Sequence, residues 1–209
     1  MSTIAIIGTG NIGAGLARVF GKAGNAILLA DTKGGAEAAV KLREAGVAAE
    51  ARDVAAAVGA AEIVILATPY GAAATLAGAA DFTGKIVIDV SNPVTADFSG
   101  LELGHDTSAA EEIAKLLPGA TVVKAFNTVF AQHYAGDLML EGRRIQTFVA
   151  SDDAAARAAV VALAAGAGFD AREAGPLANA RYLEPLGYMN IQFGYMLGLG
   201  TGIAPAWLG

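Results

Sequence analysis

The feature that most constrains this chain is a glycine-rich turn, GTGNIG at residues 8–13, which directly follows an apolar, largely β-branched run at 3–7. A helical pattern follows the turn, a second apolar run occupies 26–30, and Asp31 ends that run. Glycines in this spacing, between a strand and a helix and with an acid after the next strand, are typical of a Rossmann unit that binds a dinucleotide. The sequence therefore predicts a parallel sheet with a dinucleotide site at its edge.

Each glycine of the turn has a physical role. Gly8 permits the tight turn, Gly10 lets the backbone approach a pyrophosphate without an intervening Cβ, and Gly13 allows the helix to pack closely on the strand. The N-terminus of the following helix offers free N–H groups and partial positive charge to the phosphates. These three glycines are accordingly predicted to bind the cofactor.

Asp31 is expected beside the ribose of the adenosine half, where its carboxylate accepts hydrogen bonds from the ribose hydroxyls. A 2′-phosphate at that position would meet a like charge, and at ~4 Å and an effective dielectric of ~20 two unit charges repel by roughly 4 kcal/mol. NAD(H) is therefore favoured. Lys33 and the Thr32 hydroxyl could each serve a phosphate if Asp31 turned aside, which leaves NADP(H) open.

Beyond the turn, short apolar runs alternate with alanine-rich stretches, which is the pattern of βαβ units with strands covered on both faces. The expected fold is α/β: a Rossmann-type doubly wound parallel sheet with a small C-terminal helical extension. Residues 1–150 would form the Rossmann core, and residues 151–209 a C-terminal α/β and helical part that completes the pocket, in one compact domain. The predicted strands are 3–7, 26–30, 47–51, 62–67, 85–90, 121–126, 145–150 and 168–173, and the predicted helices are 11–23, 34–45, 52–59, 70–79, 108–117 and one from about Asp152.

Composition excludes several classes of function. The chain carries 14 basic and 20 acidic residues, for a net charge of −6, and no stretch gathers four or more Lys or Arg, so no nucleic-acid partner is expected. There is no Cys, and the two His residues, His105 and His133, are too few for most zinc sites, so no metal is expected. Residues 1–8 lack the pattern of a signal peptide, which predicts a cytoplasmic location.

No familiar set of catalytic residues is present. None of the five tyrosines is followed four residues later by Lys, and no G-x-S-x-G elbow occurs. Lys124, in the predicted strand 121–126, is the most interesting titratable group. The favoured interpretation places Lys124 on the helix-covered face with its ammonium reaching solvent, and the alternative makes it an acid at the sheet edge. We predict no catalytic side chain.

The stretch 177–209 is almost uncharged, with only Arg181 and Glu184. A long apolar run raises the question of a membrane helix. Asn190, Gln192, Pro205 and several glycines would make a poor spanning helix, so a helix buried at a pocket or subunit contact is expected and no membrane span is predicted.

Four stretches together resemble the NADP oxidoreductases that depend on coenzyme F-420, an 8-hydroxy-5-deazaflavin, and the related reductase domains of the STEAP metalloreductases. They are GTGNIGAGLA at 8–17, VSNP at 90–93, ATVVKAFNTV at 120–129 and EAGPLANARYLEPL at 173–186. The resemblance implies a Rossmann domain with a small C-terminal helical part. It also implies a dinucleotide across the sheet edge and a flavin or deazaflavin over the nicotinamide.

The resemblance extends to individual cofactor-binding positions. It implies Thr9, Asn11 and Ile12 on the pyrophosphate loop, Ala67, Thr68 and Pro69 after the fourth strand, Asn92 and Pro93 after the fifth, and Ala125, Phe126 and Asn127 beside the nicotinamide. Members specific for NADPH typically carry a basic pair after the second strand. The Asp31-Thr32-Lys33 sequence departs from that pattern, in the direction that favours NADH.

The uncharged tail is expected to form the acceptor site and part of a homodimer contact. Large apolar and aromatic side chains suit a flat ring and would be a liability on an exposed surface. Gly194 and Gly198, one helical turn apart, would allow close approach of a ring or backbone. The predicted pocket residues are Tyr188, Met189, Phe193 and Met196, with Tyr195 and Trp207 nearby.

Hydride exchange between a nicotinamide and a flavin-type ring needs orientation and dry stacking more than an acid or a base. The predicted function is therefore an NAD(P)H-dependent flavin or deazaflavin oxidoreductase. Two alternatives stay open. One is a reductase of a small carbonyl or imine, in which Lys124 or His133 protonates the product, and the other is a dinucleotide-sensing domain without turnover.

Overall fold

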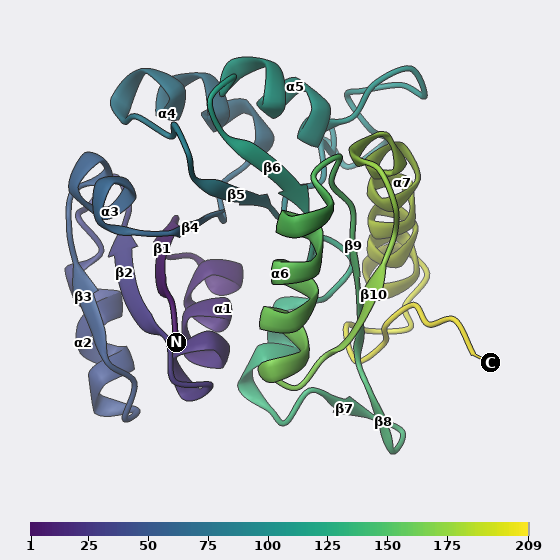
Figure 1. The fold of residues 1–209 in the computed structure, drawn as a ribbon. Coiled ribbons are helices and arrows are strands. Elements are labelled where there is room, and N and C mark those ends of the chain that lie inside the picture. The colour runs from purple at the N-terminus through teal and green to yellow at the C-terminus, as the bar shows by residue number, and fades with distance from the viewer. Residues whose placement is uncertain (209) are drawn as a thin grey trace.

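The centre of the molecule is a six-stranded parallel sheet, seen in a computed structural model that describes residues 1–208 (Figure 1). The strand order β3-β2-β1-β4-β5-β6 is that of a Rossmann fold and confirms the predicted fold class. Because strand order reverses between β1 and β4, a crevice is expected at their carboxyl ends. The strands are β1 (Thr3–Ile7), β2 (Ala26–Ala30), β3 (Ala49–Ala51), β4 (Ile63–Leu66), β5 (Ile86–Asp89) and β6 (Thr121–Lys124).

Helices cover both faces of the sheet (Figure 1). Successive residues of β1 point to opposite faces, so Ile4 and Ile6 join one apolar core while Ala5 and Ile7 join the other. Both faces are buried, which explains why the strands read as continuous apolar runs. One layer holds α1 (Asn11–Lys22), α2 (Ala36–Glu44) and α6 (Ala154–Gly166), and the other holds α3 (Val54–Ala60), α4 (Ala73–Ala79) and α5 (Ala109–Leu116).

Residues after β6 form a second, smaller sheet. Strands β9 (Gln146–Val149) and β10 (Asp170–Glu173) pair in parallel across α6, close to the predicted ranges. A single antiparallel bridge between Lys124 and Ala150 joins them to the edge of the main sheet. A short hairpin of β7 (Met139–Leu140) and β8 (Arg143–Arg144) was not predicted.

The C-terminal segment contains the helix α7 (Ala180–Ile191), which continues into the π-helical turn η4 (Gln192–Met196). Gly198 lies beyond this turn with φ of +74°, so Gly194 and Gly198 do not share a helical face and that expectation is wrong. Gly194 instead allows the Phe130 ring to pack directly against the backbone of η4, because a Cβ there would approach that ring to 2.7 Å. Across residues 1–208, no helix is both long and apolar enough to cross a membrane.

Candidate functional site

The glycine turn joins β1 to α1 at the carboxyl edge of the sheet. Gly8 has φ of +103°, and a Cβ there would collide with the Ala67 carbonyl at the end of β4. A Cβ at Gly13 would collide with the Gly8 carbonyl, whereas a Cβ at Gly10 would meet open space. Gly10 also begins α1 without a side-chain cap, so the first N–H groups of the helix face that open space. This geometry fits a pyrophosphate.

Asp31 lies beside the glycine turn, at the end of β2, where its carboxylate is held by three donors. The Thr9 hydroxyl donates to Oδ2, and the backbone N–H groups of Lys33 and Gly35 donate to Oδ1 over 2.6 and 3.0 Å. These hydrogen bonds, that from Thr9 first, lower the pKa of Asp31 below its ordinary value. The carboxylate is therefore ionised at neutral pH and fixed beside the pyrophosphate loop, with Thr32 and Lys33 exposed next to it.

A cavity of about 490 Å³ opens at the same edge of the sheet. It is lined by residues that follow β1, β4, β5 and β6, together with one face of α7 and the loop around Phe98. The predicted cofactor residues that line it are Asn11, Ile12, Ala67, Thr68, Pro69, Asn92, Phe126 and Asn127. Four separate loops of the sequence are thus brought together, as expected for strand ends that share one edge.

Ala125 and Pro93 do not line the cavity and are buried behind it. Phe126 follows with φ of +62°, a left-handed conformation that costs a bulky residue of order 1 kcal/mol or more. Its N–H donates to the Thr147 hydroxyl over 3.1 Å, and its ring packs against Phe20 and Phe169. This strained turn directs the chain from β6 into the cavity wall at Asn127.

Asn92 and Asn127 form a reciprocal pair between two strand ends. Asn92 Nδ2 donates to the Asn127 carbonyl over 2.8 Å, and Asn127 Nδ2 donates to Asn92 Oδ1 over 2.9 Å and to the Leu183 carbonyl over 2.7 Å. Gly187 of α7 lies over this pair, because a Cβ there would be 2.6 Å from Asn92 Oδ1. The pair therefore determines how closely α7 approaches the sheet.

Three buried polar atoms of the cavity lining have no hydrogen-bond partner within residues 1–208: Ser91 Oγ, Asn127 Oδ1 and Thr128 Oγ1. An unpaired buried polar group costs about 1–3 kcal/mol, so such groups in a cavity point to a polar ligand. A hydroxyl both donates and accepts, and an amide oxygen accepts. Together they match a carboxamide, the polar group of a nicotinamide ring. Ser91 and Thr128 were missed from the sequence, although each adjoins a predicted asparagine.

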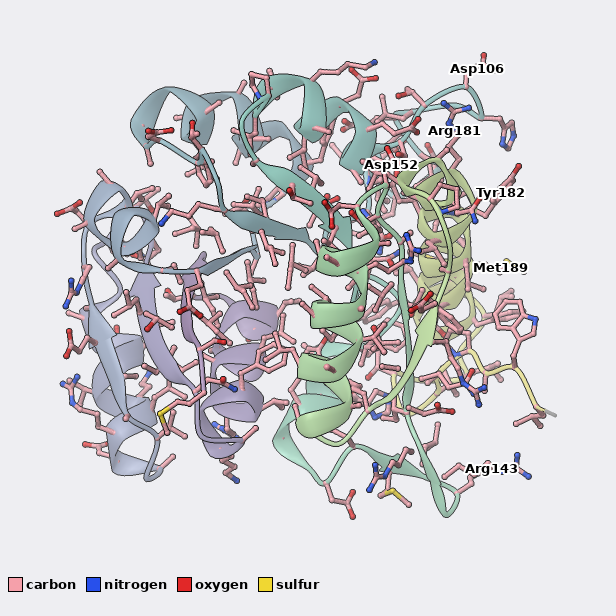
Figure 2. The ribbon with its side chains drawn as sticks, in the orientation of Figure 1. Asp106, Arg143, Asp152, Arg181, Tyr182 and Met189 are labelled. Carbon is pink, nitrogen blue, oxygen red and sulfur yellow. The ribbon has the colours of Figure 1, made fainter. Side chains whose placement is uncertain are left out.

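The tail residues predicted to form the acceptor pocket do not line this cavity. Tyr188 donates its hydroxyl to the Phe98 carbonyl over 3.0 Å, and the other three side chains are exposed, by 46% at Met189, 38% at Phe193 and 55% at Met196. Figure 2 shows Met189 and Tyr182 projecting outward from α7. Because a helix repeats every 3.6 residues, the cavity is lined by the opposite face of this segment: Gly187, Asn190, Ile191 and Tyr195.

Lys124 is fully buried, and the prediction that its ammonium reaches solvent is wrong. Its Nζ lies 2.7 Å from Asp89 Oδ2 and 2.8 Å from Glu184 Oε1, and it donates to the Ser91 carbonyl over 2.6 Å. Glu184 also accepts from the backbone N–H of Ala109, over 2.9 Å, at the start of α5. Burial raises the pKa of Glu184 despite the attraction of Lys124. Lys124 therefore supports the cavity wall from behind and does not line the cavity.

His133 is also outside the cavity lining. Its Nε2 lies 3.0 Å from the Ile203 carbonyl, so the ring fastens the tail to the turn η2 (Ala131–Ala135). The side chains that line the cavity include no carboxylate, lysine or histidine. Within residues 1–208, the one titratable side chain in the lining is Tyr195, which is exposed at the cavity mouth.

Comparisons with known proteins agree with this geometry. Residues 3–93 match the model of the family described as NADP oxidoreductase, coenzyme F420-dependent. The chain is 35% identical over 126 residues to metalloreductase STEAP3 of Rattus norvegicus, a match covering 60% of this chain and 25% of that protein. It is also 35% identical over 103 residues to human metalloreductase STEAP2. The chain thus spans only about a quarter or less of the length of these curated relatives.

Solved structures extend the likeness to the whole chain. A hypothetical protein, SMa0349 of Sinorhizobium meliloti, is 33% identical, with a TM-score of 0.76 over 85% of this chain and 87% of that one. A candidate F420-dependent NADP reductase of Arthrobacter sp. is 26% identical, with a TM-score of 0.85 over the full length of both. An imine reductase of Pseudomonas sp., at 18% identity and a TM-score of 0.68, shares the fold over 94% of this chain and 63% of that one. The chain is thus similar to coenzyme F420-dependent NADP oxidoreductases, whose family model matches its residues 3–93.

Proposed function

We propose that this protein transfers a hydride between a nicotinamide dinucleotide and a flavin or deazaflavin ring in the cavity at the sheet edge. One observation carries the proposal: the described cavity lining offers polar partners for a carboxamide but no carboxylate, lysine or histidine for acid–base work. A bound dihydronicotinamide would supply the hydride, and the proton on the acceptor ring would come from solvent. The protein then needs only to bind the two rings and hold them in the reactive orientation.

Different residues would bind different parts of the dinucleotide. The glycine turn and the start of α1 would bind the pyrophosphate, and Asp31 would bind the adenosine ribose. Ser91, Asn127 and Thr128 would bind the carboxamide and so fix the orientation of the nicotinamide ring. Phe98 and Ile191, which both line the cavity, offer apolar surface to a flat acceptor ring.

We propose that NADH binds more tightly than NADPH, although the family is described by its use of NADP. The support is Asp31, whose ionised carboxylate accepts hydrogen bonds from Thr9, Lys33 and Gly35 and would lose all three if it turned aside. A 2′-phosphate would meet this charge at the ribose.

Rapid-mixing kinetics test the reaction. Protein loaded with NADH is mixed anaerobically with riboflavin, FMN, FAD or 8-hydroxy-5-deazaflavin, and oxidation of NADH is followed at its absorbance band. We expect single-turnover reduction of at least one of these rings and no oxidation by a cyclic imine. Oxidation of NADH by the imine alone would contradict the proposal.

A second candidate, reduction of a small imine or carbonyl, is favoured by one observation. The Tyr195 side chain lies at the cavity mouth, packed edge-on against Phe130 with ring centroids 5.6 Å apart, where its hydroxyl could protonate a product. The two groups first considered for that role, Lys124 and His133, do not line the cavity.

We further propose a homodimer through the outer face of α7 and η4. Tyr182, Met189, Phe193 and Met196 are exposed and recur at intervals of seven, four and three residues, so they form one apolar stripe. That spacing suits packing against another helix, and the same stripe on a second copy of the chain supplies one.

A further inference from the structure

A second cavity, of about 390 Å³, adjoins the first and is not used by the dinucleotide or the acceptor ring. Four residues line both cavities, which therefore lie side by side along a common wall: Asn11, Phe130, Ala131 and Tyr195. From there the second cavity follows one face of α1, along Ala14, Gly15 and Arg18, and is closed by η2 and Thr201 of the tail. Arg18 lies seven residues from Asn11, which on a helix is ~10 Å.

Two donors in the second cavity lack partners. Arg18 Nε is buried without a hydrogen bond, and within residues 1–208 Arg18 forms no ion pair with a carboxylate. The Tyr134 hydroxyl is also buried and unpaired, and the whole side chain is only 1% exposed. Burial raises the pKa of Tyr134, so this hydroxyl keeps its proton. A guanidinium and a neutral hydroxyl are both available to donate to a ligand.

Nothing in the wall of the second cavity balances the charge of Arg18. Its described lining contains no Asp or Glu, and Gln132 Oε1 already accepts from the Thr201 hydroxyl. Gly15 contributes by its size, because a Cβ there would lie 2.6 Å from the Tyr134 ring, which therefore packs directly on α1. A half-buried guanidinium with a buried, unpaired Nε and no carboxylate partner, in a chain with an excess of acidic residues, indicates an anionic ligand.

We propose that the second cavity binds the anionic end, a phosphate or carboxylate, of the acceptor whose ring occupies the first cavity. The inference rests on the proposed flavin or deazaflavin reaction and narrows its substrate to rings that carry an anionic side chain. The dinucleotide's own phosphates have a site at the glycine turn, next to Asp31. The ~10 Å along α1 is comparable to an extended ribityl phosphate.

The test compares FMN with riboflavin, which share a ring and differ by one phosphate. KM values for both are measured with NADH for the wild type and for Arg18→Met, Tyr134→Phe and Lys22→Met. Lys22 is the matched control, because it is an exposed cation on α1 outside the cavity. We expect the wild-type KM for FMN to be at least tenfold lower than the KM for riboflavin. A hydrogen bond to a charged group is strong enough to change affinity by about that factor.

Arg18→Met should raise the KM for FMN about tenfold, Tyr134→Phe should raise it by a smaller factor, and neither should change the KM for riboflavin. Lys22→Met should change neither value. Equal KM values for the two flavins in the wild type, or an equal loss for both in Arg18→Met, would overturn the proposal. So would a tenfold weaker calorimetric Kd for NADH in Arg18→Met with an unchanged preference for FMN, because Arg18 would then serve the dinucleotide.

Binding without turnover separates this inference from the proposed reaction. Flavin fluorescence is titrated with wild-type protein and with Arg18→Met. FMN that binds tenfold more tightly than riboflavin, only when Arg18 is present, supports the anion site even if NADH is never oxidised. Absence of any preference for FMN in binding refutes the anion site, whatever the outcome of the rapid-mixing experiment.

Discussion

Glu184 of α7 and Lys124 of β6 form a buried ion pair, with Oε1 and Nζ 2.8 Å apart. Asp89 completes the cluster, 2.7 Å from the same Nζ. Two carboxylates and one ammonium are thus buried behind the cavity wall. Glu184 accepts hydrogen bonds from the backbone N–H groups of Ala109 and Ala110 at the start of α5. The partial positive charge of this helix end compensates the net negative charge of the cluster. The cluster fastens α7 and α5 to the sheet.

Lys124→Met should lower the free energy of unfolding by about 3–5 kcal/mol, because both carboxylates lose their cation in a buried site. Urea denaturation measures the loss. Lys115→Met is the control, since the Lys115–Glu112 pair is exposed and such pairs contribute about 1 kcal/mol or less. Equal and small losses in both variants would show that the buried cluster is not stabilising.

The cost of Lys124→Met should depend on pH. Burial already raises the pKa of Glu184 above its ordinary 4.5, and removing Lys124 takes away the attraction that opposes this rise. The folded variant then binds a proton that the unfolded chain releases near 4.5, so its stability is greatest in acid and falls as pH rises through the raised pKa. Urea denaturation at pH 5 and pH 8 should give a smaller loss at pH 5, and the reverse order would contradict this account.

Asp31→Asn should reduce the ratio of the NADH affinity to the NADPH affinity about tenfold. The substitution removes the charge that a 2′-phosphate meets and keeps the shape of the side chain. Calorimetry measures both affinities. Asp106→Asn is the control, since Asp106 is an exposed acid on a distant loop (Figure 2). If the wild type already prefers NADPH tenfold, the role assigned to Asp31 is wrong.

Gly187→Ala should weaken NADH binding at least tenfold, because its Cβ would be 2.6 Å from Asn92 Oδ1 and 2.9 Å from Asn127 Nδ2. Either the asparagine pair or α7 must move, and Asn127 belongs to the proposed carboxamide site. Calorimetry measures the affinity, with folding checked by circular dichroism. In the control, Gly78→Ala, the new methyl on α4 meets open space, and full affinity in both variants would remove the pair from the cofactor site.

Tyr195→Phe and His133→Ala should each leave flavin reduction within about tenfold of the wild type, since a flavin-type acceptor needs no protein acid. A general acid typically contributes 10²–10⁴-fold. A loss of that size in Tyr195→Phe, measured in single-turnover mixing at unchanged affinity for NADH, would support the imine or carbonyl reductase instead.

Met189→Asp should shift the protein from dimer to monomer in sedimentation velocity, because it places a charge in the apolar stripe of α7. Met139→Asp is the matched control: Met139 is 41% exposed, similar to Met189 at 46%, but lies on the β7 hairpin. A wild type that sediments as a monomer, or an equal shift in both variants, would argue against dimerisation through α7.

Much of the fold was determined by short-range patterns in the sequence. Mainly apolar runs predicted the six sheet strands to within two residues at each end. Five of these runs are nearly continuous because strands buried on both faces need no polar alternation, whereas the edge strand β3 exposes Glu50. The glycine turn was equally predictable, because its geometry requires glycine at fixed positions. A Cβ at Gly8 or at Gly13 would collide with nearby backbone atoms. The β7 hairpin was not predictable in this way. Its turn places Glu141 and Gly142 at positive φ, and Glu is a rare residue there.

The face of α7 that meets the cavity was decided only by tertiary structure. Composition marked Met189 and Phe193 as apolar, but a helix apolar on several sides does not show which side packs inward. That choice depends on Gly187, which fits against the Asn92–Asn127 pair from distant loops. The partnership of Lys124 with Glu184 has the same origin: residues far apart in sequence meet at one sheet edge, and no local pattern encodes that meeting.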